Sequence, residues 1–308
     1  MRNSALNGHL AMLAASGMWG LMAPVSKYVM SAGTVNPLAV TDVRIFGGAI
    51  LFWIFSLFAK REKVEKKDYF RLFLAGMFAI VMNQGVYITG ISMTSPVDAS
   101  VITTSLPIIA MIISALYLKE PITGKKVSGV LLGATGALIL VFGESLTPGF
   151  QPGSQVPVRT SSPGGNLMCF LAQCSYAVYL VIFKDLISRY SPVTLMKWMF
   201  LFASAVMIPL TGSNFIRTDW AAVPALEYAA LGFILLGGTF FCYLLVPIGQ
   251  KALRPTIVAT YNYVQPVVAS FAAILWGMDR FSILKAVSII LVFSGVFLVN
   301  KSRAKNQT

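Results

Sequence analysis

Polar side chains and prolines recur at matched positions in two long apolar segments of this 308-residue chain. The positions are Thr103, Thr104 and Pro107 in the earlier segment and Asn262, Tyr263, Gln265 and Pro266 in the later one. A proline inside a helix frees the carbonyl group four residues earlier, here that of Thr103 and of Asn262. Free carbonyl, hydroxyl and amide groups within an apolar segment could bind a polar solute. The alternative is a plain helix kink, with the carbonyl satisfied by a neighbouring Ser or Thr.

A second group of polar residues, Asn83, Gln84 and Tyr87, lies in another apolar segment. Amide side chains both donate and accept hydrogen bonds, as the recognition of a zwitterion or an amide requires. The alternative is hydrogen bonding between helices, worth about 0.6 kcal/mol for each bond in a membrane. The same two interpretations apply to Tyr179 and Tyr243.

Several aromatic residues also lie deep in apolar segments. At a rise of about 1.5 Å per residue, Trp19 and Tyr176 each lie about 15 Å into a helix. Together with Tyr243, Tyr261 and Tyr263 they would form a pocket whose aromatic walls suit amphipathic or aromatic solutes. The alternative is packing, or anchoring at the membrane surface.

Charged residues within the apolar segments are few. Arg44 and Lys197 could attract a substrate carboxylate or act in gating, or could extend along the helix to the membrane surface. The carboxylates of Asp98, Glu120 and Asp279 map to segment ends, whereas ion-driven carriers usually keep an acid in the transport path. This distribution favours facilitated diffusion or solute exchange over obligatory ion coupling. The three cysteines and the single histidine show no metal-ligand spacing, so we expect no metal and no other cofactor.

These residues are carried by a strongly apolar chain. Hydrophobic residues make up 56% of it and charged residues 11%, whereas a soluble domain has roughly a quarter charged residues. Apolar blocks of about 18–25 residues fit helices that cross a hydrocarbon core of about 30 Å. The blocks are 9–30, 37–59, 70–91, 96–118, 124–142, 164–187, 192–211, 225–250, 256–277 and 281–300. We therefore expect an all-α integral membrane protein with ten transmembrane helices.

The chain also contains an internal repeat. Residues 96–141 align without a gap over residues 255–300, at an offset of 159. Each half holds an odd number of predicted spans, five, so the second repeat must enter the membrane upside-down relative to the first. We expect a first repeat at 1–142 and a second at 164–308. The Pro- and Gly-rich segment 143–163 between them reads as a flexible external linker.

The net charge of +13 follows the topology of the spans. Lys and Arg gather in the loops after the second and fourth spans and near both termini, which predicts that both termini are cytoplasmic. This placement accounts for the charge without a nucleic-acid partner.

The chain resembles the EamA family of the drug/metabolite transporter superfamily. The motifs that carry the resemblance are Trp19-Gly20, Arg44 after Pro37, Pro107 before Glu120-Pro121, and the series Gly129, Gly133 and Gly136. The resemblance implies a ten-helix inner-membrane carrier, commonly an exporter of amino acids or related metabolites. It also implies a central cavity lined by the first, third and fourth helices of each half. The second half departs from the pattern, because Lys197-Trp198-Met199 lies near where an Arg would match and Asp279-Arg280 replaces the Glu-Pro pair.

We expect a secondary transporter, not an enzyme, that exports small organic metabolites such as amino acids by alternating access. Its partners would be a small-molecule substrate and the lipid bilayer. A channel, which would need a continuous polar stripe, is one alternative. An intramembrane enzyme, which would need a nucleophile–base pair or a metal cluster, is another, and a structural scaffold or receptor is a third. The sequence leaves open the substrate, the coupling ion and the oligomeric state.

Overall fold

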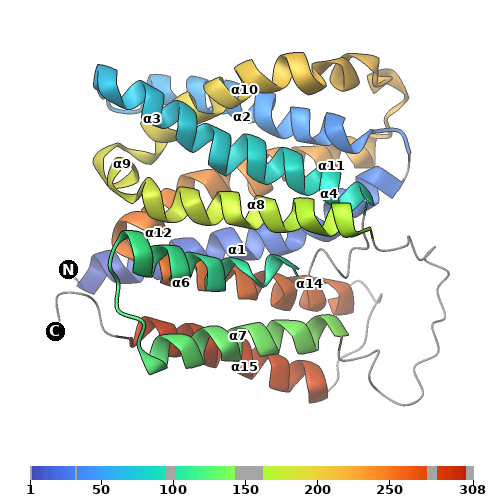
Figure 1. Cartoon of the computed structure of the whole chain (residues 1–308). Helices are drawn as coiled ribbons and strands as arrows, with labels where there is room; N and C mark the ends of the chain where they lie inside the picture. Colours follow the sequence, from blue (N-terminus) through green and yellow to red (C-terminus); the bar gives the residue numbers. More distant parts are fainter. Residues whose placement is uncertain (1, 32, 94–101, 143–161, 276–282, 303–308) are drawn as a thin grey trace.

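The structure is a computed structural model that describes residues 2–31, 33–93, 102–142, 162–275 and 283–302. Within these ranges every regular element is a helix and none is a strand (Figure 1). Six helical segments there are long and apolar enough to cross a membrane, namely Pro37–Phe58, Lys66–Gly90, Pro163–Ile182, Pro192–Arg217, Ala225–Ala252 and Ile283–Asn300. The expectation of an all-helical membrane protein is confirmed at this level.

The first part of the chain folds into a series of helices. The helix predicted from residue 37 starts there, whereas the one predicted from residue 9 already starts at Arg2. They are α1 (Arg2–Ser31), α2 (Pro37–Phe58), α3 (Lys66–Gly76), η1 (Met77–Gly85), α4 (Val86–Met93), α6 (Leu106–Tyr117) and α7 (Gly124–Phe142). The start of α2 follows from its sequence. Asn36 Oδ1 accepts a hydrogen bond from the backbone N–H of Leu38 at 2.8 Å, and Pro37 occupies the first turn.

The second part follows the same order of elements. They are α8 (Pro163–Ile182), α9 (Lys184–Arg189), α10 (Pro192–Arg217), η2 (Trp220–Ala222), α11 (Ala225–Leu235), η3 (Leu236–Phe241), α12 (Cys242–Ala252), α13 (Pro255–Thr260), η4 (Tyr261–Tyr263), α14 (Val264–Leu275) and α15 (Ile283–Asn300). The segment predicted as one span, 164–187, is interrupted at Phe183, where the backbone leaves helical geometry. Most of the predicted linker, 143–163, lies outside the described residues.

Two of the predicted spans contain wider helical turns that the sequence pattern does not reveal. The elements η1 and η3 are π-helical and join α3 to α4 and α11 to α12. A π-helical turn shifts the backbone hydrogen bonds from i+4 to i+5 and is often found at functional sites. The helix of 255–275 is interrupted as well, by the 3-10 turn η4, which lies just before Pro266.

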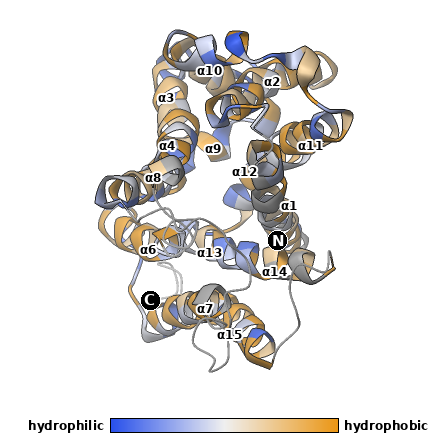
Figure 2. Cartoon of the chain, turned by 90° about the vertical axis from the view of Figure 1, so that its right-hand side faces the viewer, coloured by the Kyte–Doolittle hydropathy of each residue, from blue (hydrophilic) through white to orange (hydrophobic). Residues whose placement is uncertain are grey.

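The helices α7 and α15 lie side by side (Figures 1 and 2). A Cβ atom added to Gly129 would lie 2.7 Å from the carbonyl oxygen of Gly295, and one added to Gly295 would lie 2.6 Å from that of Gly129. Only glycine permits this approach. Small residues drive helix association in lipid in this way, because burial gains little there.

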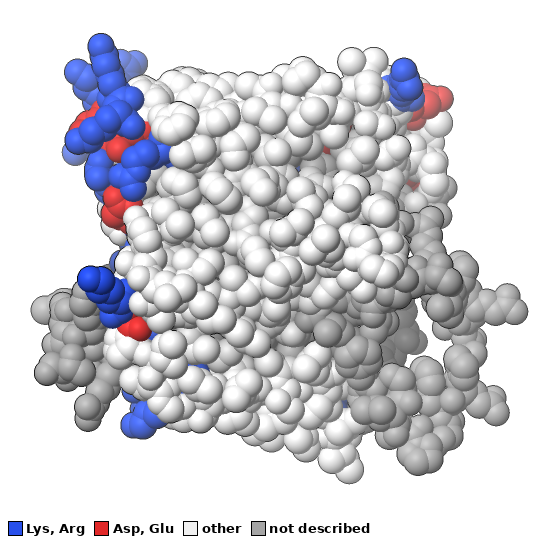
Figure 3. All heavy atoms as spheres, viewed as in Figure 1, with Lys and Arg blue, Asp and Glu red and all other residues white. Residues whose placement is uncertain are grey.

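The outer surface of the molecule suits a bilayer. Leu6, Leu10 and Leu13 form an exposed stripe along α1, and Phe58 is 83% exposed. Figure 2 shows apolar residues on the outward faces of the helices seen end-on, and Figure 3 shows a broad uncharged belt with Lys and Arg gathered at one end. An apolar belt of this kind is what lipid contact requires.

The glycine contact between α7 and α15 gives a testable prediction. We expect Gly129→Ala to lower the free energy of unfolding by about 1–3 kcal/mol, because the added methyl group meets backbone atoms that cannot yield. The matched control is Gly232→Ala on α11, where an added Cβ has no atom within 4 Å. Thermal melting of the detergent-purified protein measures both. Equal melting temperatures for the two variants would contradict this account of the packing.

Candidate functional site

A cluster of aromatic rings occupies the middle of the helix bundle. The ring of Trp19 on α1 lies edge-on to Tyr176 of α8 at 6.3 Å and to Tyr243 of α12 at 6.1 Å. Tyr243 also contacts Phe200 of α10 at 5.0 Å, and Tyr176 stacks on Tyr179 at 5.8 Å. We call these five residues, together with Gln84 and Gln250, the central cluster. The structure thus brings Trp19, Tyr176 and Tyr243 together, as the sequence predicts for these aromatic residues. It adds Tyr179 to the same group.

Two glutamine amides bind the hydroxyl groups of this cluster. Gln84 Nε2 donates to the hydroxyl of Tyr243 at 2.6 Å, and the hydroxyl of Tyr179 donates to Gln250 Oε1 at 3.3 Å. The other polar atom of each amide, Gln84 Oε1 and Gln250 Nε2, is buried without a hydrogen-bond partner. A buried polar atom without a partner costs about 1–3 kcal/mol. The cluster therefore holds one acceptor and one donor that a polar ligand could satisfy.

The π-helical turn η3 contributes backbone groups to the same region. Trp19 Nε1 donates to the carbonyl oxygen of Gly238 at 3.0 Å. Gly238 lies within η3, where the π-helical turn departs from the regular i+4 hydrogen bonds of an α-helix. The contact fixes the ring of Trp19 at the point where α1 meets η3.

Arg44 is a buried cation beside the cluster. Its side chain on α2 is 7% exposed, and its Nε donates to the hydroxyl of Thr239 in η3 at 3.0 Å. None of the ion pairs in the described part of the chain involves Arg44. A guanidinium group can bind a carboxylate through two parallel hydrogen bonds. An anionic group of a ligand could therefore pair with the positive charge of Arg44.

Other predicted residues form two separate polar pairs. The hydroxyl of Tyr87 lies 3.2 Å from Thr103 Oγ1, where either oxygen could donate. Gln265 Nε2 donates to Asn262 Oδ1 at 3.1 Å, across the junction of η4 and α14. The pair of Asn262 and Gln265 is a second candidate region.

The remaining predicted residues pack between helices. Tyr263 is 1% exposed, and its hydroxyl lies within hydrogen-bond distance of two carbonyl oxygens, that of Val130 at 3.2 Å and that of Thr104 at 3.4 Å. Pro107 is buried in the first turn of α6, and Pro266 is half-buried. The hydroxyl of Tyr263 thus connects η4 to α7 and to the residues just before α6.

Three predicted residues lie away from the cluster. Asn83 Nδ2 donates to the carbonyl oxygen of Ala172 at 3.1 Å, which joins η1 to α8. Lys197 lies over the ring of Trp53, with its Nζ 5.1 Å from the ring centre, and this stacking occupies the cation. Tyr261, expected among the aromatic residues of the site, has its hydroxyl 2.7 Å from His9 Nδ1 instead.

Sequence reasoning missed Gln250 and Thr239, and it placed Lys126 in a solvated loop. Lys126 is fully buried and donates to Glu120 at 2.8 Å. The sequence contains a sign of this burial, because Lys285 occupies the same position of the repeat, 159 residues later. In the structure Lys285 is buried as well, with 4% exposure. A buried cation at the same place in both halves indicates a structural ion pair.

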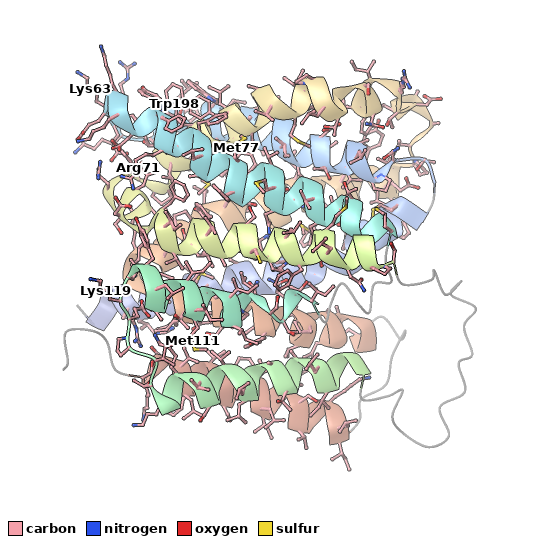
Figure 4. The ribbon with its side chains drawn as sticks, viewed as in Figure 1. Lys63, Arg71, Met77, Met111, Lys119 and Trp198 are labelled. Atoms are coloured by element: carbon pink, nitrogen blue, oxygen red, sulfur yellow. The ribbon has the colours of Figure 1, made fainter. Side chains whose placement is uncertain are left out.

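A polar network ties the two halves at the end of the molecule that carries Lys63 and Arg71 (Figure 4). Asp68 on α3 binds Arg189 at 2.5 Å and accepts from the hydroxyl of Tyr190 at 2.7 Å. In the preceding loop, Glu62 accepts from the backbone N–H of Ser191 at 2.9 Å. Burial alone would raise the pKa of Glu62, but the donors of Ser191 and Thr194 outweigh it and hold the pKa below its usual value. The carboxylate therefore stays ionised and bound.

In the described part of the chain, three hydrogen bonds join residues that are 159 positions apart, the offset of the sequence repeat. They join Gln84 to Tyr243, Ser204 to the carbonyl of Ile45, and Tyr263 to the carbonyl of Thr104. Each therefore connects residues that occupy the same position of the sequence repeat.

Comparison with known proteins identifies the class. Residues 6–142 and 163–301 each match the EamA-like transporter family. The chain belongs to this family and is a membrane transporter by that membership.

Similar proteins cover almost the whole chain. An uncharacterized transporter of Archaeoglobus fulgidus is 23% identical over 92% of this chain and 95% of its own length. The uncharacterized transporter YyaM of Bacillus subtilis is 22% identical over 98% of both chains. A WAT1-related protein of Arabidopsis thaliana is 24% identical over 78% of this chain and 70% of its own. A crystal structure with 17% identity shares the fold, with a TM-score of 0.74 over 97% of this chain and 96% of the other.

The buried ion pair of Glu120 and Lys126 gives a second prediction. Glu120→Gln leaves Lys126 charged and fully buried, so we expect a loss of about 3–5 kcal/mol of stability, measured as a fall in melting temperature. Removing both charges, in Glu120→Gln with Lys126→Met, should recover much of this loss. Lys125→Gln changes an exposed neighbour and should have little effect. A Glu120→Gln variant as stable as the parent would contradict the prediction.

Proposed function

We propose that the chain forms ten transmembrane helices in two inverted five-helix repeats, 1–142 and 164–308, joined by the linker 143–163. The family match in two parts supports this division. The helix starts support it as well, because α11 begins at Ala225 and α15 at Ile283, each 159 residues after α3 and α7. The contacts between residues 159 apart are what a pseudo-two-fold axis would produce.

We propose that the protein lies in the plasma membrane with both termini on the cytoplasmic side. The support is the distribution of charge. The end of the molecule where Lys and Arg gather is the end where α1 begins and α15 finishes (Figures 1 and 3). Positively charged loops remain on the cytoplasmic side during insertion.

The function we propose is secondary transport by alternating access around the central cluster. The observation that carries it is the hydrogen bond of Gln84 with Tyr243, which joins the two halves at equivalent positions within the cluster. An exchange of conformations between two inverted repeats leaves contacts on the axis in place and opens contacts at either end. The substrate would then stay near the axis while access to it alternates.

The substrate class we propose is a small organic acid with an apolar part, such as a hydrophobic amino acid. Arg44 would bind the carboxylate, and the free atoms Gln84 Oε1 and Gln250 Nε2 would bind further polar groups. The rings of Trp19 and Tyr176 would contact the apolar part. Export is the direction implied by the resemblance to the family.

Ligand binding by Arg44 can be tested against a matched cation. We expect phenylalanine or leucine to raise the melting temperature of the parent protein and of Lys197→Gln, but not of Arg44→Gln. A ligand at 100 times its Kd stabilises the folded state by about 2.7 kcal/mol. Flux of the same amino acid into proteoliposomes should fall at least tenfold in Arg44→Gln, since a charge-assisted pair is lost. Equal stabilisation of both variants would remove Arg44 from the site.

The pair of Asn262 and Gln265 gives a separate test of the second candidate region. We expect Asn262→Ala and Gln265→Ala each to lower transport while membrane insertion and yield remain unchanged. The two side chains bind each other, so the double variant should cost no more than the larger single effect. Unchanged flux in both single variants would show that these residues act only in packing.

A further inference from the structure

Four carboxyl groups in the described part of the chain are buried, and they differ in their partners. They belong to Asp42, Asp68, Glu120 and Glu227, all less than 9% exposed. Asp68 is paired with arginine and Glu120 with lysine. Neither Asp42 nor Glu227 takes part in an ion pair within the described ranges. Asp42 is 0% exposed on α2, and its hydrogen-bond partner there is Thr211 of α10. An unpaired ionised carboxylate in such a place is too costly, and groups of this kind become neutral instead.

The hydrogen bonds of Thr211 also require a proton on Asp42. Thr211 Oγ1 lies 2.5 Å from Asp42 Oδ1 and 3.1 Å from the carbonyl oxygen of Met207. A hydroxyl group has one hydrogen and therefore donates to one of these two acceptors. Both contacts are hydrogen bonds only if Asp42 donates to Thr211 while Thr211 donates to Met207. The second carboxyl oxygen, Asp42 Oδ2, is buried without a donor, which suits the carbonyl oxygen of a neutral acid.

The elements packed against α2 are α10, α11, η1, η3 and α4. Their charged or titratable groups are Lys197 and Arg217 on α10, Glu227 and Tyr228 on α11, and Tyr87 on α4; η1 and η3 have none, and α2 itself carries Arg44. Lys197 stacks on Trp53, Glu227 accepts from the hydroxyl of Thr34, and Arg44 donates to Thr239. The side chain of Lys27 on α1 lies outside the described residues. Thus no described cation neutralises Asp42.

We propose that Asp42 is a proton-binding site of the carrier, protonated in this conformation, and that its proton couples transport to the proton gradient. The coupling rests on the proposed function. Asp42 lies on α2 and its partner Thr211 on α10, one from each proposed repeat, so their relative movement changes its surroundings. On release, the O–H bond of Asp42 breaks, and the proton passes to water at the end where α2 begins. The carboxylate keeps the electron pair and then accepts a hydrogen bond from the hydroxyl of Thr211. That hydroxyl in turn gives up its hydrogen bond to the carbonyl oxygen of Met207.

Infrared spectroscopy of the purified protein tests the protonation without any substrate. We expect a C=O stretching band of protonated carboxylic acids at neutral pH that loses one component in Asp42→Asn. Glu227 is the other buried carboxyl group without an ion pair, so Glu227→Gln serves as the matched comparison and should leave the Asp42 component in place. Thr211→Val should move the band, because its acceptor is lost. Gel filtration and melting temperature establish that each variant is folded. A parent band that survives unchanged in a folded Asp42→Asn variant, or a parent with no such band, would overturn the proposal.

Flux tests the coupling. In proteoliposomes, a pH gradient should accelerate the uptake of labelled phenylalanine by the parent, and Asp42→Asn should lose this acceleration while keeping exchange without a gradient. Phenylalanine flux in the parent that does not respond to the gradient would overturn the coupling even if the infrared band is present. No phenylalanine flux in any variant would count against the proposed substrate class instead, and the infrared result would still stand.

Discussion

The structure depends on contacts between equivalent residues of its two halves. Gln84 with Tyr243, Ile45 with Ser204, and Thr104 with Tyr263 join η1, α2 and the residues before α6 to α12, α10 and η4. The contacts of α7 with α15 are paired in the same way. Gly129 contacts Gly295, and the residues at the repeat-equivalent positions, Ser288 and Gly136, also contact each other. In lipid, where apolar burial gains little, such close and polar contacts must hold the halves together.

The central cluster is less symmetric than the helices that carry it. Tyr176 and Tyr179 on α8 correspond, at the same offset, to Gly17 and Gly20 on α1. Tyrosine supplies two rings to the cluster, whereas an added Cβ at Gly20 would lie 2.6 Å from the carbonyl oxygen of Gln265. At these two positions α8 therefore adds rings to the cluster, whereas Gly20 lets α1 lie close to α14. A symmetric scaffold can bind an asymmetric solute in this way.

The sequence predicts the helices well where local chemistry defines them, as at Asn36-Pro37 for α2 and Ser191-Pro192 for α10. It also predicts that Trp19, Tyr176 and Tyr243 come together, because depth along a helix is set by residue number. It misses the π-helical turns, whose extra residue per turn leaves no hydrophobic pattern, and with them the role of Thr239. The sequence also does not reveal the burial of Gln250 and Lys126. A polar residue near a helix end is expected to be exposed to solvent, and only the packing of other helices shows that these two are buried.

The most direct test of the account is a comparison of two cross-links in a cysteine-free chain. Cysteines at Ile45 and Ser204 would bridge a contact on the proposed axis. Cysteines at Asp68 and Arg189, joined by a reducible bifunctional thiol reagent that spans the length of the arginine side chain, would bridge a contact at the end of the molecule that carries Lys63 and Arg71 (Figure 4). The account predicts that the axial bridge leaves amino acid exchange in proteoliposomes largely intact. The bridge at the end that carries Lys63 and Arg71 should stop exchange until it is reduced. Exchange that continues with the end bridged, or stops with only the axis bridged, would contradict alternating access about this axis.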